Sequence, residues 1–104
     1  MDKTNKYYEC HITLLCDSDK DIDTVKWLTE ARGWSFSRID GDIVEGAGVK
    51  CYATRHYHSK YSVETIIGEL NRQANMYRHE FVTRKKIELV VYDTKSDKIR
   101  PDSI

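Results

Sequence analysis

A histidine and a threonine stand two positions apart in residues 7–16, which read YYECHITLLC. Polar and apolar residues alternate through this stretch with period two, the pattern of a half-buried β-strand. Because successive side chains of a strand point to opposite faces, His11 and Thr13 are expected side by side on the polar face, next to Glu9. An imidazole can transfer a proton and a hydroxyl can bind a phosphate oxygen. This strand therefore carries a candidate binding or catalytic site.

Three further stretches, residues 34–39, 49–58 and 81–92, show strand-like alternation and are predicted as strands. In the second of them Val49, Cys51 and Ala53 share the apolar face. The polar faces of the last two stretches carry further groups that can bind an anion or transfer a proton: Lys50, Tyr52, Thr54, His56, Arg84, Lys86 and Glu88.

Two amphipathic helices are predicted between these strands. The first spans about residues 22–32 and ends at Gly33, a typical C-terminal residue. The second follows Ser62, whose hydroxyl can cap it, and reaches about Arg78 or His79. We expect Gly68, inside the second helix, to mark close packing against the sheet.

The order strand, helix, strand, strand, helix, strand is that of the ferredoxin-like α+β fold. It predicts a four-stranded antiparallel sheet of order 4-1-3-2, with both helices on one face and the other face open. The 104 residues suffice for one domain, which we place over residues 1–104. Its core is expected over about residues 6–94, and residues 95–104 are predicted to be a flexible tail.

In this order the first strand lies between the third and the fourth, so their polar side chains meet on the open face. We predict that His11 and Thr13 are the catalytic pair, assisted by Lys86 and His56. The predicted ligand contacts are Glu9, Tyr52, Thr54, Arg84 and Glu88.

The composition limits the function classes. Lys+Arg and Asp+Glu number 17 each, so no overall charge attracts nucleic acid or an anionic membrane. No apolar run has the length of a membrane span and the N-terminus has no signal-peptide pattern, from which we expect a cytoplasmic protein. Cys10, Cys16 and Cys51 form no C-x-x-C pair and are interpreted as small buried side chains.

No cofactor is predicted. A metal site is the alternative interpretation of His56 and His58, with His79 or Glu88 as further ligands, but the spacing supplies no clear third and fourth ligand. RNA binding on the sheet is not favoured, because Tyr7 and Tyr52 are not set in an aromatic RNP-like run.

The motif His11-Ile12-Thr13 resembles one half of the 2H phosphoesterases, in which two H-x-T or H-x-S motifs cleave cyclic phosphodiesters and RNA ends. That resemblance implies an acid–base role for His11 and phosphate binding by Thr13. The chain also resembles small uncharacterised bacterial and phage proteins with a Tyr-Glu-x-His-Ile-Thr opening strand and a Lys-Ile-Glu final strand. The matching residues here are 8–13, 39–42, 86–88 and 93–95. No second H-x-T motif occurs in this chain.

Three hypotheses follow from the sequence. The first is a module, homodimeric in this interpretation, that binds a small phosphate- or nucleotide-like anion on the open sheet face. The second is a phosphodiester hydrolase with His11 as general acid or base. The third is an interaction protein whose sheet face is a dimer interface.

Overall fold

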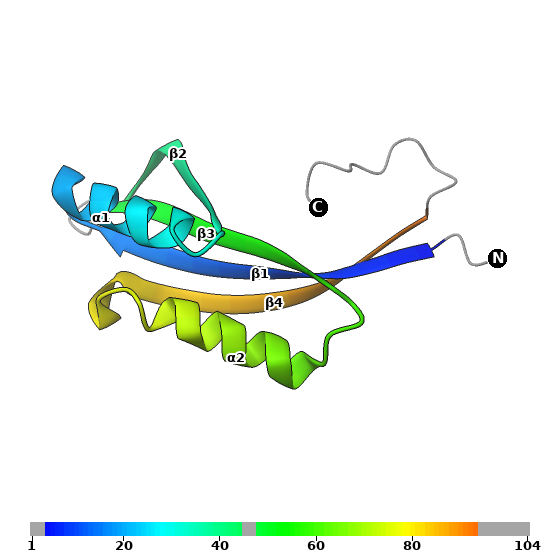
Figure 1. Ribbon diagram of the computed structural model, residues 1–104. Coiled ribbons are helices and arrows are strands. Elements are labelled where there is room, and N and C mark those ends of the chain that lie inside the picture. Colours follow the sequence, from blue (N-terminus) through cyan, green and yellow to red (C-terminus); the bar gives the residue numbers. More distant parts are fainter. Residues whose placement is uncertain (1–3, 45–47, 94–104) are drawn as a thin grey trace.

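The computed structural model describes residues 4–44 and 48–93. Its elements follow one another as β1 (Thr4–Cys16), α1 (Asp19–Glu30), β2 (Ser35–Val44), β3 (Gly48–His58), α2 (Val63–Ala74), the 3-10 turn η1 (His79–Phe81) and β4 (Val82–Asp93) (Figure 1). The predicted tail, residues 95–104, lies outside the described residues.

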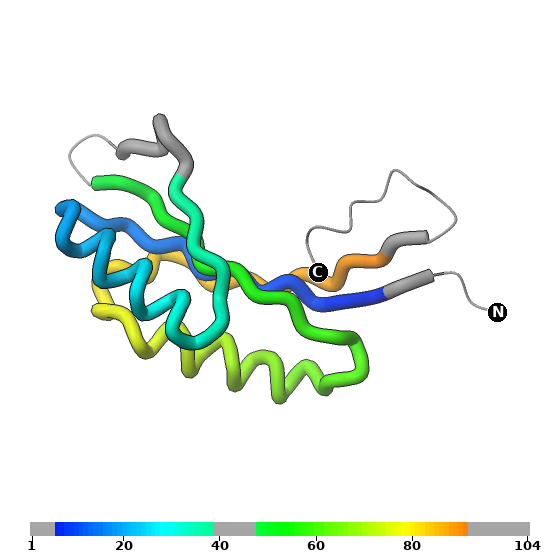
Figure 2. The backbone as a smooth tube through the Cα atoms, turned by 45° about the horizontal axis from the view of Figure 1, so that its top comes forward, coloured from blue at the N-terminus to red at the C-terminus, as the bar shows by residue number. Residues whose placement is uncertain are grey.

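The four strands form one sheet of order β2-β3-β1-β4, in which every neighbouring pair is antiparallel. Both helices cover the same face of this sheet, and the two views in Figures 1 and 2 agree on it. The predicted α+β architecture and the strand order 4-1-3-2 are therefore confirmed, since the two orders are the same sheet read from opposite edges. At the end near the termini, β1 and β4 continue beyond the helices as a two-stranded ribbon.

The start of α1 lies three residues before the predicted one. The Ser18 hydroxyl accepts a hydrogen bond from the backbone N–H of Asp21 at 3.1 Å and so caps the helix before Asp19. The helix ends at Glu30, and Gly33 then takes a positive φ of 81°. Ser62 caps α2 as predicted, accepting from the N–H of Thr65 at 3.1 Å.

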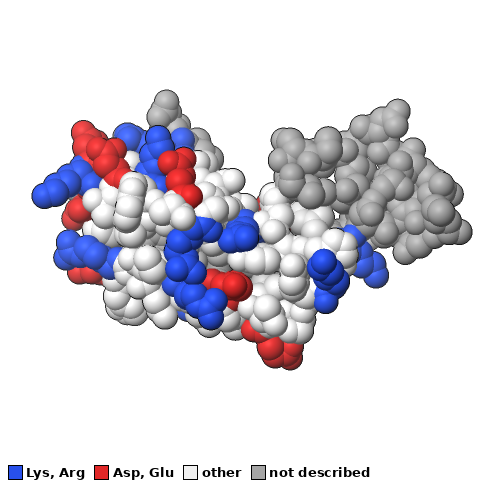
Figure 3. All heavy atoms as spheres, viewed as in Figure 1, with Lys and Arg blue, Asp and Glu red and all other residues white. Residues whose placement is uncertain are grey.

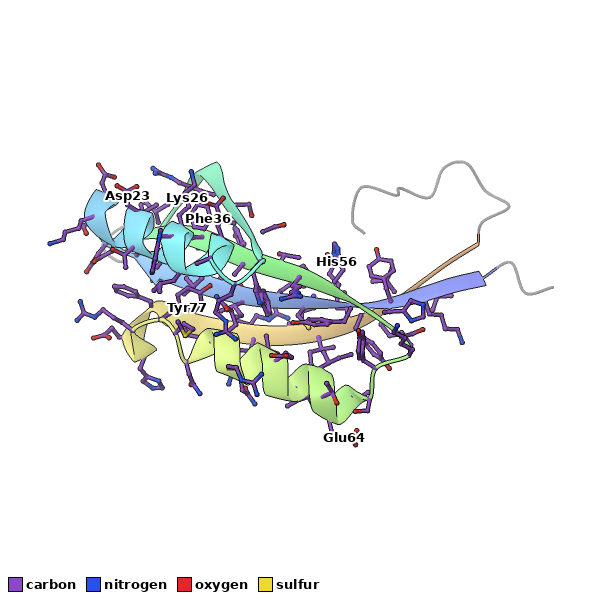
Figure 4. The ribbon with its side chains drawn as sticks, viewed as in Figure 1. Asp23, Lys26, Phe36, His56, Glu64 and Tyr77 are labelled. Carbon is purple, nitrogen blue, oxygen red and sulfur yellow. The ribbon has the colours of Figure 1, made fainter. Side chains whose placement is uncertain are left out.

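The predicted end of α2 at about Arg78 is wrong, because the helix ends at Ala74. Beyond it the backbone tightens: the N–H groups of Met76 and Tyr77 donate to the carbonyl oxygens three residues earlier, at 3.0 and 3.3 Å. This tighter turn directs Tyr77 into the core between α1 and α2, where only 5% of it is exposed (Figure 4).

The core lies between the sheet and the two helices. It combines the apolar faces of β1 and β3 with the inner stripes of α1 and α2. The apolar positions of α2 are only partly buried, because Val63 and Ile67 are each 43% exposed. The packing role predicted for Gly68 is wrong as well, since no atom beyond the neighbouring backbone of its own helix lies within 4 Å of a Cβ built at that position.

Acidic and basic side chains are interspersed over the face shown in Figure 3, with no large patch of one sign. This distribution agrees with the formal net charge of +0. Neither α1 nor α2, the α-helices in the described part of the chain, has the length and hydropathy needed to span a membrane.

Cys10, Cys16 and Cys51 are fully buried free thiols, as their strand parity predicts. Burial raises the pKa of Cys10 to about 11 and that of Cys16 to about 12. The reactive thiolate is thus scarce and inaccessible in the native state. We expect iodoacetamide near neutral pH to leave all three cysteines unmodified in the folded protein and to alkylate all three in denaturant, as counted by intact mass. Rapid alkylation of the native protein would contradict this burial.

Candidate functional site

The central position of β1 brings polar side chains of three strands together on the open face. In the β-ladders, His11 lies between Thr54 of β3 and Lys86 of β4. The adjacent rows are equally regular: Tyr52, Thr13 and Arg84 lie on one side, and His56, Glu9 and Glu88 on the other. The predicted set therefore forms a three-by-three grid, one column from each strand.

His11 is bonded at both ring nitrogens. Its Nδ1 lies 3.2 Å from the Thr54 hydroxyl oxygen. Its Nε2 lies 3.1 Å from a carboxylate oxygen of Glu9 and 3.4 Å from one of Glu88. An Nε2–H that donates to the carboxylates leaves Nδ1 to accept from the threonine hydroxyl, so these partners favour one tautomer and fix the ring plane.

Glu9 and Glu88 occupy directly opposed positions of β1 and β4, where two like charges repel each other. The His11 ring reduces this repulsion by donating between them, and the Lys86 ammonium lies 3.2 Å from Glu88. The carboxylates thus hold the imidazole and the ammonium in place at one end of the grid.

His56 lies next to this cluster and points away from α2 (Figure 4). Its Nε2 is 3.5 Å from the same Glu9 oxygen and makes no hydrogen bond of good geometry. The Tyr7 ring meets the His56 ring edge-on at a centroid distance of 5.1 Å. Tyr7 itself is only 7% exposed, so it offers no open ring face for stacking a base.

An open pocket of about 410 Å³ lies over the grid. Seven of the nine predicted site residues line it, including His11, Thr13 and Arg84. Glu9 and His56 lie outside the lining. The predicted catalytic partner His56 therefore lies beside Glu9, in the row next to that of His11, and does not line the pocket.

Ser37 of β2 also lines this pocket and was absent from the predicted set. It lies opposite Tyr52, and Ser35 lies opposite Thr54. The signal for both serines was present in the sequence, because Trp34 and Phe36 alternate with them and are directed toward the core. Applying to β2 the parity argument used for the other strands would have placed both serines on the open face.

A second hollow of about 560 Å³ continues from the pocket toward the start of β3. The two share Thr13, Tyr52 and Arg84, and the second adds Lys50. Basic and hydroxyl side chains thus follow one another along the open face, while the two carboxylates lie at the opposite end.

The alternative interpretation of His56 and His58 as metal ligands has no support from the arrangement of the described residues. His58 uses its Nδ1 to accept a hydrogen bond from the backbone N–H of Lys60 at 2.9 Å. Within residues 4–44 and 48–93, no three His, Cys, Asp or Glu side chains are grouped so that they could hold a metal ion.

No protein-family model, curated protein or solved structure matches this chain. Any inference about its function therefore depends on the geometry of the site.

Proposed function

We propose that the open sheet face binds a small anion of the phosphate-ester class in the pocket beside His11. The main observation in favour is that Arg84 lines this pocket and forms none of the ion pairs found among the side chains that the structure describes. A guanidinium held next to an open pocket is suited to bidentate binding of a phosphate.

We assign the architecture to the ferredoxin-like class on element order alone.

Hydroxyl groups complete the proposed phosphate site. Thr13 lies directly opposite Arg84 on the open face, and Ser37 and Tyr52 line the same pocket. Each hydroxyl can donate to a phosphate oxygen. A volume of about 410 Å³ is typical of small-molecule sites and leaves room for a sugar or base attached to the phosphate.

Binding is better supported than cleavage. An acid–base catalyst needs a ring nitrogen directed at the substrate, whereas Thr54 and two carboxylates occupy both nitrogens of His11. A second proton-transfer group is also needed, and His56 lies outside the pocket. In this proposal His11 positions Thr54 and the carboxylates.

Isothermal titration calorimetry of the protein with nucleoside monophosphates, cyclic nucleotides and sugar phosphates tests the proposal. We expect one class to bind, and Arg84→Ala to weaken its affinity by about 10- to 100-fold, because a hydrogen bond to a charged group contributes about 1.5–3 kcal/mol. Binding should also weaken as salt rises, since the pocket is open to solvent.

Lys26→Ala is the matched control, because it removes one cation from the exposed surface of α1 (Figure 4). This variant should bind as the wild type does. Equal loss of affinity in both variants would indicate a general charge effect, and the absence of binding across the whole panel would exclude the proposal.

A further inference from the structure

Exposed apolar side chains gather along one edge of the molecule, which we call the β4 edge: Val63 and Ile67 of α2, and Leu89 and Val91 of β4. Val63 and Ile67 lie one turn apart, and Asn71 is the next residue on this helical stripe. The Asn71 side chain accepts a hydrogen bond from the Lys85 ammonium of β4 at 2.9 Å. The stripe therefore faces β4 and not β3.

α2 and β4 run in opposite directions (Figure 1). Their apolar residues can therefore be compared by their distance along the two elements. From Asn71 back to Val63 the helix advances about 12 Å, and from Lys85 to Leu89 the strand advances about 13 Å in the same direction. These advances bring Val63 to the level of Leu89 along the strand, and Ile67 to the level of Ile87. The result is a continuous apolar strip beside the strand.

β4 is also an outer strand of the sheet, and among the described residues only β1 pairs with it. Its outer row of backbone N–H and C=O groups can accept another strand. Natural edges are usually blunted by bulges, prolines or inward charges. The register shift in the β1–β4 ladder lies at Thr13 and Leu14, and from Lys85 to Asp93 the pairing is regular.

We propose that a second copy of this chain pairs its β4 antiparallel to β4, with the two-fold axis at Ile87. Such a dimer has one eight-stranded sheet. An axis that passes through a residue gives opposed residues the same face parity, so both helix layers lie on one side and both open faces on the other. Ile67 then faces the partner's Ile67 across the axis.

The charges of Lys86 and Glu88 favour the register with the axis at Ile87. With the axis at Ile87, Lys86 lies opposite the partner's Glu88, and Glu88 opposite the partner's Lys86. An axis at Glu88 would oppose two glutamates, which is unfavourable. An axis at Leu89 would place Glu88 opposite the partner's Val90, without a cation. Only the Ile87 register is self-complementary in charge among these three.

The partner also contributes to the site. Glu88 lines the pocket and lies 3.4 Å from the His11 Nε2. The partner's Lys86 would approach this carboxylate from the side that is open to solvent in one copy. In the dimer each pocket then gains a wall along β4, and each receives one more cation, the partner's Lys86. The dimer itself requires no ligand.

The test is sedimentation equilibrium of the full chain and of charge-reversal variants. The wild type is expected at twice the chain mass of 12.2 kDa. Lys86→Glu opposes two acidic side chains at each charge pair, and Glu88→Lys opposes two basic ones, so each variant alone should be monomeric. An equimolar mixture of the two variants should regain the dimer mass, because each pair then joins opposite charges.

Trp27→Ala is the control, since Trp27 is 68% exposed on α1 and its loss should leave the dimer intact. Leu89→Lys should be a monomer by sedimentation and folded by circular dichroism, because it places a second cation opposite the partner's Lys85, while little packing is lost at a side chain that is 52% exposed. A monomeric wild type would overturn the proposal. So would a mixture that stays monomeric, since it would exclude the Ile87 register. Ligand titration is a separate readout, so failure of the proposed anion binding leaves these masses unaffected.

Discussion

Gly48→Ala is expected to destabilise the protein by about 2 kcal/mol or more, the largest loss we predict for a single methyl group. Gly48 begins β3 with a φ of +118°, a conformation that L-residues with a Cβ rarely adopt. A Cβ at this position would also collide with the backbone carbonyl oxygen of Cys16. The end of β1 and the start of β3 cannot separate freely, because Cys16 and Val49 are paired in the β1–β3 ladder.

Thermal unfolding monitored by circular dichroism measures this effect, and Gly68→Ala supplies the matched control. Gly68 lies inside α2 with no atom near the position of a new Cβ. The same methyl group there should stabilise the helix by up to about 1 kcal/mol. The two variants should thus shift the midpoint in opposite directions, by about 4–8 °C per kcal/mol. A Gly48→Ala protein as stable as the wild type would show that β1 and β3 do not approach each other as described.

The candidate site was largely predictable because one rule determines it. Side chains of a strand alternate between faces, so the parity of Cys10, Ile12 and Leu14 in the core places Glu9 and His11 on the other face. The β-α-β-β-α-β order then predicts which strands flank β1. What parity cannot give is the pairing register, and therefore that both ring nitrogens of His11 are occupied. This occupancy is the reason why we propose a positioning role for His11 in place of the catalytic role predicted from the sequence.

Buried polar residues of the helices were not predictable in the same way. Thr29 and Gln73 are completely buried, although each is a polar residue in its own helical pattern. Their burial is possible because each has a hydrogen-bond partner far along the chain: Thr29 bonds Tyr77, 48 residues away and just beyond the end of α2, and Gln73 bonds the carbonyl of Leu28 in α1, 45 residues away. A pattern within one helix contains no information about such a partner.

Tyr77 is the centre of this network. Its hydroxyl lies 2.6 Å from the Thr29 hydroxyl, which donates in turn to the Val25 carbonyl at 2.7 Å. It also accepts from the Gln73 amide at 2.8 Å. The phenol oxygen therefore donates to Thr29 and accepts from Gln73, and joins α1 to α2 beneath the sheet.

Tyr77→Phe should accordingly destabilise the protein by about 1–3 kcal/mol, because it leaves a buried amide N–H and a buried hydroxyl short of one partner each. The pH dependence should change as well. Burial raises the pKa of the Tyr77 phenol above its ordinary value of 10.0. Above that pH the unfolded chain loses this proton while the folded chain keeps it, so the stability of the wild type falls as pH rises through the folded pKa.

Urea unfolding at neutral and at alkaline pH separates the two effects. The free energy of unfolding of Tyr77→Phe should start lower and fall less steeply above pH 10.0, the ordinary pKa of the phenol. The raised pKa values of the cysteines add the same alkaline slope to both proteins and cancel in the difference. Tyr61→Phe is the control, since Tyr61 is 45% exposed and should leave both the stability and its slope unchanged. Equal slopes for the wild type and Tyr77→Phe would mean that the phenol ionises as easily in the folded chain as in the unfolded one, and would contradict the rise in its pKa that burial causes.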